Sequence, residues 1–156
     1  MNSSKRNFRI SGLCLLAAVW LGATGCQSFS ASETKSLTSV TITSRSMADV
    51  QAAVTKVFTA HMFDNVLNQE NQFTFTRAGT SADQMAYSSM TFNRPITVKV
   101  VVTTQPQGAD TIIVGCNAWI IESENDPVFQ EIHPVHAFGK RPYDDLLQEV
   151  KTQLGE

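Results

Sequence analysis

The sequence predicts an α+β fold, a two-layer sandwich in which an antiparallel sheet of about five strands carries two helices on one face. Five segments alternate apolar with polar side chains, as half-buried strands do. Two other segments place apolar residues three and four positions apart, as amphipathic helices do. Four of the strand-like segments follow one another between the two helices, so the predicted order is β-α-β-β-β-β-α and the pairing is expected to be antiparallel.

The first predicted strand runs from Val40 to Ser44, where Val40 and Ile42 alternate with threonines. The other four are residues 73–76, 85–92, 96–104 and 111–121. In the last of them every second residue is apolar, which predicts a core row of Ile112, Val114, Cys116, Ala118 and Ile120. Cys116 is therefore expected to be a small core residue with an ordinary thiol. The polar, Asn-rich residues 65–71 lie outside the predicted strands, and residues 122–141 are predicted to be a long loop with little regular structure.

Both predicted helices carry terminal signals. Ser46 and Asp49 resemble a capping box with aspartate in place of the usual Glu or Gln, so the first helix is expected to begin there. Its apolar stripe extends to about Met62 and consists of Met47, Val50, Val54, Val57, Phe58 and Met62. The second helix is expected to have Pro142 in its first turn and to stop at Gly155. Its stripe is formed by Leu146 or Leu147 with Val150 and Leu154.

The N-terminus has the layout of an export signal. Lys5, Arg6 and Arg9 precede an uncharged, largely apolar run from Ile10 to Ala23. A helix needs roughly 20 apolar residues to cross the hydrocarbon core of a bilayer, and this run is shorter. The sequence therefore predicts a cleaved signal peptide and not a permanent membrane span.

The residues Ala23-Thr24-Gly25-Cys26 resemble the lipobox of bacterial lipoproteins, although the lipobox usually has leucine where Ala23 stands. The resemblance covers about the first 26 residues. It implies cleavage before Cys26, attachment of diacylglyceryl to the Cys26 thiol and acyl chains such as palmitate that hold the protein to a membrane. Gln27 at the second mature position implies the periplasmic face of the outer membrane. An ordinary secretory signal, with Cys26 unmodified, is the alternative.

These features divide the chain into a signal peptide (1–25), a Ser/Thr-rich tether (26–39) and a single α+β domain (40–156). Three of the twelve basic residues and none of the fourteen acidic ones precede Cys26, so the mature part has nine basic and fourteen acidic side chains and a net charge of −5. An acidic domain without a basic cluster is a poor nucleic-acid binder. Membrane contact is therefore expected to depend on the lipid anchor, and protein partners are expected in the envelope.

Few residues of the sequence are candidates for metal binding or catalysis. Within the segment Glu131 to His136, His133 and His136 could ligate a transition metal, but no second half of a metal site is visible, and surface histidines are the alternative. The acidic residues Glu122, Glu124 and Asp126 fit a solvated loop as well as paired catalytic carboxylates. No catalytic motif occurs, so the sequence predicts no cofactor and no enzymatic activity.

The last predicted strand suggests a partner surface. Ile113, Trp119 and Ile121 lie on the face opposite the core row, where they would be exposed together if helices cover only the other face. Coverage of these residues by a loop or by residues 122–141 is the alternative.

Three functions remain open from the sequence. The first is a non-enzymatic lipoprotein that binds another protein or orders an assembly. The second is a carrier of a small apolar ligand held between sheet and helix, in a cavity lined by Phe58, Met62, Phe73, Phe75 and Val100. The third is an enzyme assisted by a metal on His133 and His136.

Overall fold

The computed structural model of the chain describes residues 35–87 and 94–156. Within them the strands are β1 (Thr38–Thr43), β2 (Asp64–Gln69), β3 (Gln72–Ala78), β4 (Ile96–Pro106), β5 (Thr111–Glu122) and β6 (Glu131–Pro134). The helices are α1 (Met47–Ala60), α2 (Ser81–Tyr87) and α3 (Arg141–Gln153), with a short 3-10 turn, η1 (Ala137–Gly139), before α3. The predicted signal peptide, Cys26 and the tether up to residue 34 lie outside the described residues. None of the helices in the described part is long and apolar enough to span a bilayer.

The strands form a six-stranded sheet in the order β1-β5-β4-β3-β2, and β6 also pairs with β5. All neighbouring strands are antiparallel. At its centre is the long β4–β5 hairpin, in which Val100 lies opposite Ala118 and Val102 opposite Cys116. β1 pairs with the first half of β5 and β6 with its last four residues, so both strands flank the same edge of β5.

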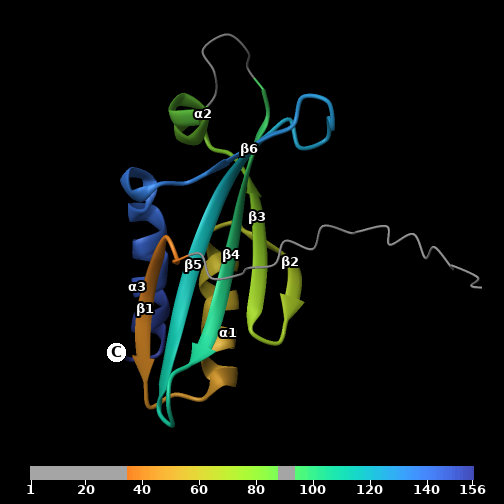
Figure 1. The fold of residues 1–156 in the computed structure, drawn as a ribbon. Helices are drawn as coiled ribbons and strands as arrows, with labels where there is room; N and C mark the ends of the chain where they lie inside the picture. The colour runs from red at the N-terminus through yellow and green to blue at the C-terminus, as the bar shows by residue number, and fades with distance from the viewer. Residues whose placement is uncertain (1–34, 88–93) are drawn as a thin grey trace, which may run out of the picture. The chain divides into compact units, whose positions relative to one another are not determined.

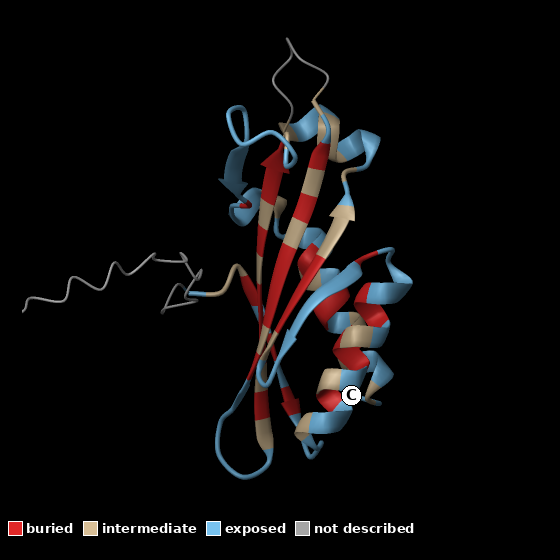
Figure 2. Cartoon of the chain, turned by 90° about the vertical axis from the view of Figure 1, so that its right-hand side faces the viewer, coloured by how far each residue is buried: buried red, intermediate tan, exposed pale blue. Residues whose placement is uncertain are grey.

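The helices α1 and α3 cover one face of this sheet, and α2 lies near one end of it (Figure 1). Buried positions recur along β4 and β5 and on both large helices (Figure 2). The core rows of the central strands are buried and comprise Val98, Val100 and Val102 in β4 and Ile112, Val114, Cys116, Ala118 and Ile120 in β5. The predicted fold class, an antiparallel sheet with two helices on one face, is confirmed.

The predicted helix signals of α1 and α3 are present as well. The Ser46 side chain accepts a hydrogen bond from the Asp49 backbone N–H at 3.1 Å, which caps α1. Pro142 lies in the first turn of α3, and Gly155 follows that helix with a φ of +79°. Leu146, Leu147 and Val150 are buried, as the apolar stripe predicts.

Residues 65–71 were placed outside the predicted strands, but β2 occupies most of this stretch. All six residues of β2 are exposed, and the register shifts between Asn65 and Leu67. A strand that buries neither face needs no apolar alternation, and the bulge breaks what periodicity remains. The edge position of β2 explains both properties.

The prediction of a strand at residues 85–92 was wrong where the structure describes it, because Ser81–Tyr87 form α2. Thr80 and Asp83 cap this helix reciprocally: the Asp83 N–H donates to Thr80 Oγ1 at 3.2 Å, and the Thr80 N–H donates to Asp83 Oδ2 at 2.8 Å. Residues 88–93 lie outside the described part of the chain. The Thr-x-x-Asp spacing of residues 80–83 is the sequence signal for this helix, and the apolar-polar alternation used to predict a strand does not include it.

The region 122–141, predicted as a loop, contains β6 and η1. β5 is twice as long as β1, 12 residues against 6, so its last residues have an edge that β1 does not reach. β6 pairs there, with Ile132 opposite Ile121. Pairing to an existing strand edge can order a segment that has no periodicity of its own.

Candidate functional site

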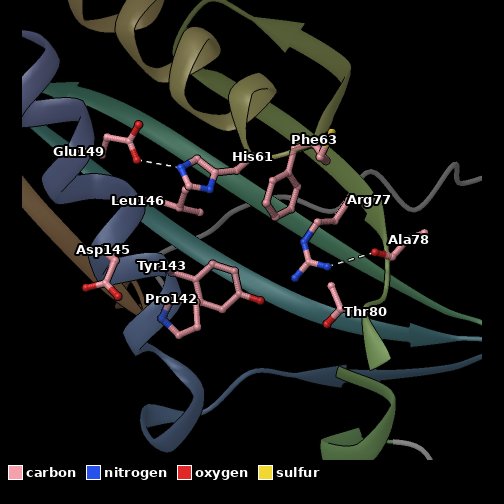
Figure 3. A pocket seen from close by; sticks show the side chains of 11 residues that line it. His61, Phe63, Arg77, Ala78, Thr80, Pro142, Tyr143, Asp145, Leu146 and Glu149 are labelled. Carbon is pink, nitrogen blue, oxygen red and sulfur yellow. Dashed lines mark hydrogen bonds and ion pairs between the residues drawn. The ribbon is translucent and has the colours of Figure 1, made fainter. Parts of the chain in front are cut away.

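A pocket of about 570 Å³ lies where the helix layer ends, between the C-terminus of α1, the end of β3 and α3 (Figure 3). It is formed by residues 61–63, by Arg77, Ala78 and Thr80, and by Pro142, Tyr143, Asp145, Leu146 and Glu149. Phe63, Tyr143 and Leu146 are buried and provide an apolar floor. A volume of this size is typical of ligand pockets.

The α1 side of the pocket is formed by the turn that ends α1. The Phe63 N–H donates to the Phe58 carbonyl and the Met62 N–H to the Thr59 carbonyl, both at 3.1 Å. Met62 has a φ of +64°, so the turn is a Schellman motif with methionine at the position that usually holds glycine.

This turn corrects the prediction that Met62 belongs to the buried stripe of α1. The left-handed residue turns the chain away from the helix direction, and the Met62 side chain is 82% exposed. Phe63 takes its place against the core, with its ring 5.5 Å from that of Phe58. Met62 therefore lies exposed at the edge of the pocket.

On the α3 side, Tyr143 directs a hydroxyl into the pocket (Figure 3). The residue is only 5% exposed, yet its hydroxyl has no hydrogen-bond partner among the described residues. Burial raises the pKa of Tyr143, and this effect outweighs the opposing effect of the Arg77 charge. The hydroxyl is therefore protonated at neutral pH and available as a donor.

Arg77, at the end of β3, points toward the Tyr143 hydroxyl (Figure 3). Its Nη1 donates to Asp83 Oδ2 at 2.9 Å and to the Ala78 carbonyl at 3.0 Å, and the guanidinium carbon lies 5.1 Å from the centre of the Phe63 ring. Burial raises the pKa of Asp83, but hydrogen bonds from Thr80 and Arg77 hold it below its usual value. Arg77 is thus fixed through one nitrogen, and its Nε and Nη2 make no hydrogen bond within the described residues.

The rim on the α3 side is acidic. Glu149 and Asp145 are one helical turn apart, and Glu149 Oε2 lies 2.7 Å from Nε2 of His61 (Figure 3). This pairing joins the end of α1 to α3. The pocket therefore has a guanidinium and a phenol at one end, an apolar floor, and carboxylates on the rim at the other.

The predicted metal candidates lie elsewhere. His133 is on β6, where its Nε2 is 3.4 Å from Glu131 and 3.9 Å from the buried carboxylate of Glu122. His136 is exposed and precedes η1. In residues 35–87 and 94–156, no three His, Cys, Asp or Glu side chains are arranged to hold a metal ion.

The predicted partner surface is only partly exposed. Ile121 is 5% exposed, whereas Ile113 and Trp119 are half-buried on the face opposite the helices. The first described residues reach this face: the Leu37 N–H donates to Asn117 Oδ1 at 2.8 Å. Part of the face that the helices leave open is thus occupied by the chain that leads into β1.

The elements α2, β6 and η1 lie toward one end of the sheet (Figure 1), and several large apolar side chains in and between them are exposed. They are Met85, Val128, Phe129, Ile132 and Phe138. Exposed apolar groups in several neighbouring segments are a feature of surfaces that contact other molecules.

Four of the five residues proposed to line a carrier cavity fill the core instead, and the fifth, Met62, is exposed. The Phe58 and Phe75 rings stack 4.7 Å apart, and Phe73 and Val100 are buried beside them. Cys116 is fully buried, as predicted, and burial raises the pKa of its thiol, which makes it a poor nucleophile.

The sequence analysis did not identify His61, Arg77, Tyr143 or Glu149 as residues of this pocket. They come from segments far apart in the chain, so no local spacing connects them. Comparison of the chain with protein-family models and with curated proteins finds no match in either.

Proposed function

We propose that this chain is a lipid-anchored lipoprotein of the cell envelope, held to the periplasmic face of the outer membrane, that acts by binding a partner and not by catalysis. The pocket between α1, β3 and α3 is its binding site. One observation carries the binding role: the pocket presents donors that no other described residue uses, the Tyr143 hydroxyl and two nitrogens of Arg77, beside an apolar floor.

Met62 adds a cost in folding free energy at the edge of this pocket. A non-glycine residue in the left-handed region costs about 1 kcal/mol. Backbone strain of this kind tends to occur at sites that serve function.

The anchor is supported by the sequence around Cys26. Nine residue steps separate Cys26 from Lys35, the first described residue. An extended chain advances about 3.3–3.6 Å per residue, so the domain would stay within about 30 Å of the bilayer surface. A binding module held this close would meet partners of the same membrane.

A catalytic role has less support. His61 beside Glu149 resembles a base oriented by a carboxylate. The only hydroxyls among the lining residues are those of Thr80 and Tyr143, and Thr80 Oγ1 is bound to Asp83 Oδ2 at 2.8 Å. The lining residues thus offer binding groups but no activated nucleophile.

The anchor is tested by growing cells with a clickable fatty acid and comparing the wild type with Cys26→Ala. Incorporation into the wild type alone is expected. Label in both proteins, or in neither, contradicts the lipoprotein assignment.

The binding site is tested by placing a photo-crosslinking amino acid at Met62 and, as a control, at the exposed Gln107, which lies between β4 and β5 and outside the pocket. A crosslinked envelope partner is expected at position 62 only, and the Tyr143→Phe change in the same chain is expected to abolish it. Crosslinks of equal yield at both positions, or crosslinks unaffected by Tyr143→Phe, contradict the pocket as the binding site.

A further inference from the structure

The donors of the pocket converge at one end. The Arg77 guanidinium and the Tyr143 hydroxyl point toward each other (Figure 3), and the described residues leave Arg77 Nε, Arg77 Nη2 and the hydroxyl without acceptors. The ion pair with Asp83 at 2.9 Å holds the guanidinium in place and offsets its charge, but it uses only one of its nitrogens. These donors favour a ligand with acceptor oxygens.

The apolar floor between the two ends of the pocket favours a ligand that carries an apolar group. Phe63 and Leu146 are buried beneath the pocket, and Met62 stands exposed at its edge. A ligand that reaches the donors must pack against these side chains. Its acceptor group must therefore be attached to an apolar body.

The acidic rim sets the direction of the ligand. Asp145 and Glu149 would repel an anionic group placed beside α3. They would accept hydrogen bonds from N–H groups there, Glu149 through the oxygen that is not paired with His61. A ligand with an anionic end near Arg77 and N–H donors further along its length satisfies both ends of the pocket. A polypeptide that ends in an apolar residue has this order of groups.

We propose that the pocket binds the C-terminal residue of a polypeptide, with its carboxylate on Tyr143 and Arg77, its apolar side chain on Phe63 and Leu146, and its backbone N–H groups toward Asp145 and Glu149. This inference rests on the proposed binding function and names its ligand class. The Tyr143 hydroxyl acts as a neutral donor to the carboxylate. Arg77 supplies the charge-assisted hydrogen bonds, which are the stronger ones.

Ligand-observed saturation-transfer NMR on the full chain in detergent, with protein-free micelles as the blank, tests this class. The probes are N-acetyl-Ala-Ala-Leu with a free carboxylate, the same peptide as its C-terminal amide, and 4-methylpentanoate, a free apolar acid of matching size. The free-acid peptide is expected to bind at least about tenfold more tightly than the amide, because a hydrogen bond to a charged group is lost with the amide.

Three variants locate the carboxylate. Tyr143→Phe removes the hydroxyl donor, which bonds no other described residue. This change is expected to weaken binding of the free-acid peptide about tenfold and binding of the amide little. Arg77→Gln is expected to weaken binding of the free-acid peptide further, but this substitution also removes the ion pair with Asp83. Arg141→Gln, an exposed residue of the same helix outside the pocket, is the matched control and is expected to leave binding unchanged.

Equal binding of free acid and amide, or no effect of Tyr143→Phe on the free acid, overturns the proposal. Tight binding of 4-methylpentanoate with the same dependence on Tyr143 keeps the carboxylate site but overturns the peptide end as its source. Failure of all three probes, while the Met62 crosslink still depends on Tyr143, overturns the ligand class and leaves the proposed binding function standing.

Discussion

Phe58 and Phe63 contact each other at the C-terminal end of α1 in two ways, through a backbone hydrogen bond and through their aromatic rings. The Phe63 N–H donates to the Phe58 carbonyl at 3.1 Å, and the two rings meet edge to face with centroids 5.5 Å apart. The contact buries Phe63 and turns Met62 outward. Residues 58–63 thus complete the core with Phe58 and Phe63 and build one wall of the pocket with residues 61–63.

Replacing Met62 with glycine is expected to stabilise the protein by about 0.5–1 kcal/mol, because glycine adopts a φ of +64° without steric cost. Urea unfolding followed by circular dichroism measures the change. Met62→Ala is the control, since alanine keeps a Cβ in the left-handed region and should bring no gain. A Met62→Gly protein less stable than Met62→Ala would show that the turn is not under strain.

Replacing Tyr143 with phenylalanine is expected to leave the free energy of unfolding unchanged or slightly raised, because the lost hydroxyl has no partner among the described residues. Tyr143→Ala is expected to cost about 3–5 kcal/mol, since it also removes a buried ring. Chemical denaturation of both variants gives the comparison. A loss above about 1 kcal/mol in Tyr143→Phe would reveal a structural partner for the hydroxyl.

Asp83 should make stability depend on pH. Its pKa is lower in the folded state than in the unfolded chain, so its ionised form stabilises the fold above the unfolded value of about 4, and this contribution is lost as pH falls through the folded pKa. Asp83→Asn is expected to be less stable than the wild type at pH 7, with a difference that shrinks below about pH 4.

Urea unfolding at a series of pH values measures this difference. Asp64→Asn, an exposed carboxylate on β2, is the control and should show little difference at any pH. A difference for Asp83→Asn that stays constant from pH 7 to acid pH would mean that its hydrogen-bond geometry and not its charge stabilises α2.

Gly115 provides room for the chain that enters β1. A Cβ at this position would lie 2.4 Å from Ser36 Oγ and 3.1 Å from Thr103 Oγ1. Gly115→Ala is therefore expected to destabilise the protein by about 1 kcal/mol, as overpacking does. Ser36→Gly in the same chain should restore most of the loss, and a double-mutant cycle by denaturation measures the coupling. Strict additivity of the two changes would mean that Ser36 does not occupy this space.

The periodic parts of the fold could be predicted because their pattern is local. β4 and β5 bury one face each, so every second residue must be apolar, and Cys116 takes its place in that row. β2 buries neither face, and α2 is a seven-residue helix without buried residues, so neither leaves an apolar pattern to read. β6 forms because β5 extends beyond β1, which depends on the lengths of two other strands.

The sequence alone determined the α+β class, the central hairpin with its buried rows, the two large helices and, through the residues that precede Cys26, the expectation of a lipid anchor. Only the tertiary structure decided the pocket. Met62 lies in the turn after α1, Arg77 in β3 and Tyr143 in α3, and the sequence of each segment does not mark these residues as belonging to one pocket. They become a site because the sheet and both helices bring them together, and no pattern of period two or 3.6 records a contact between distant segments.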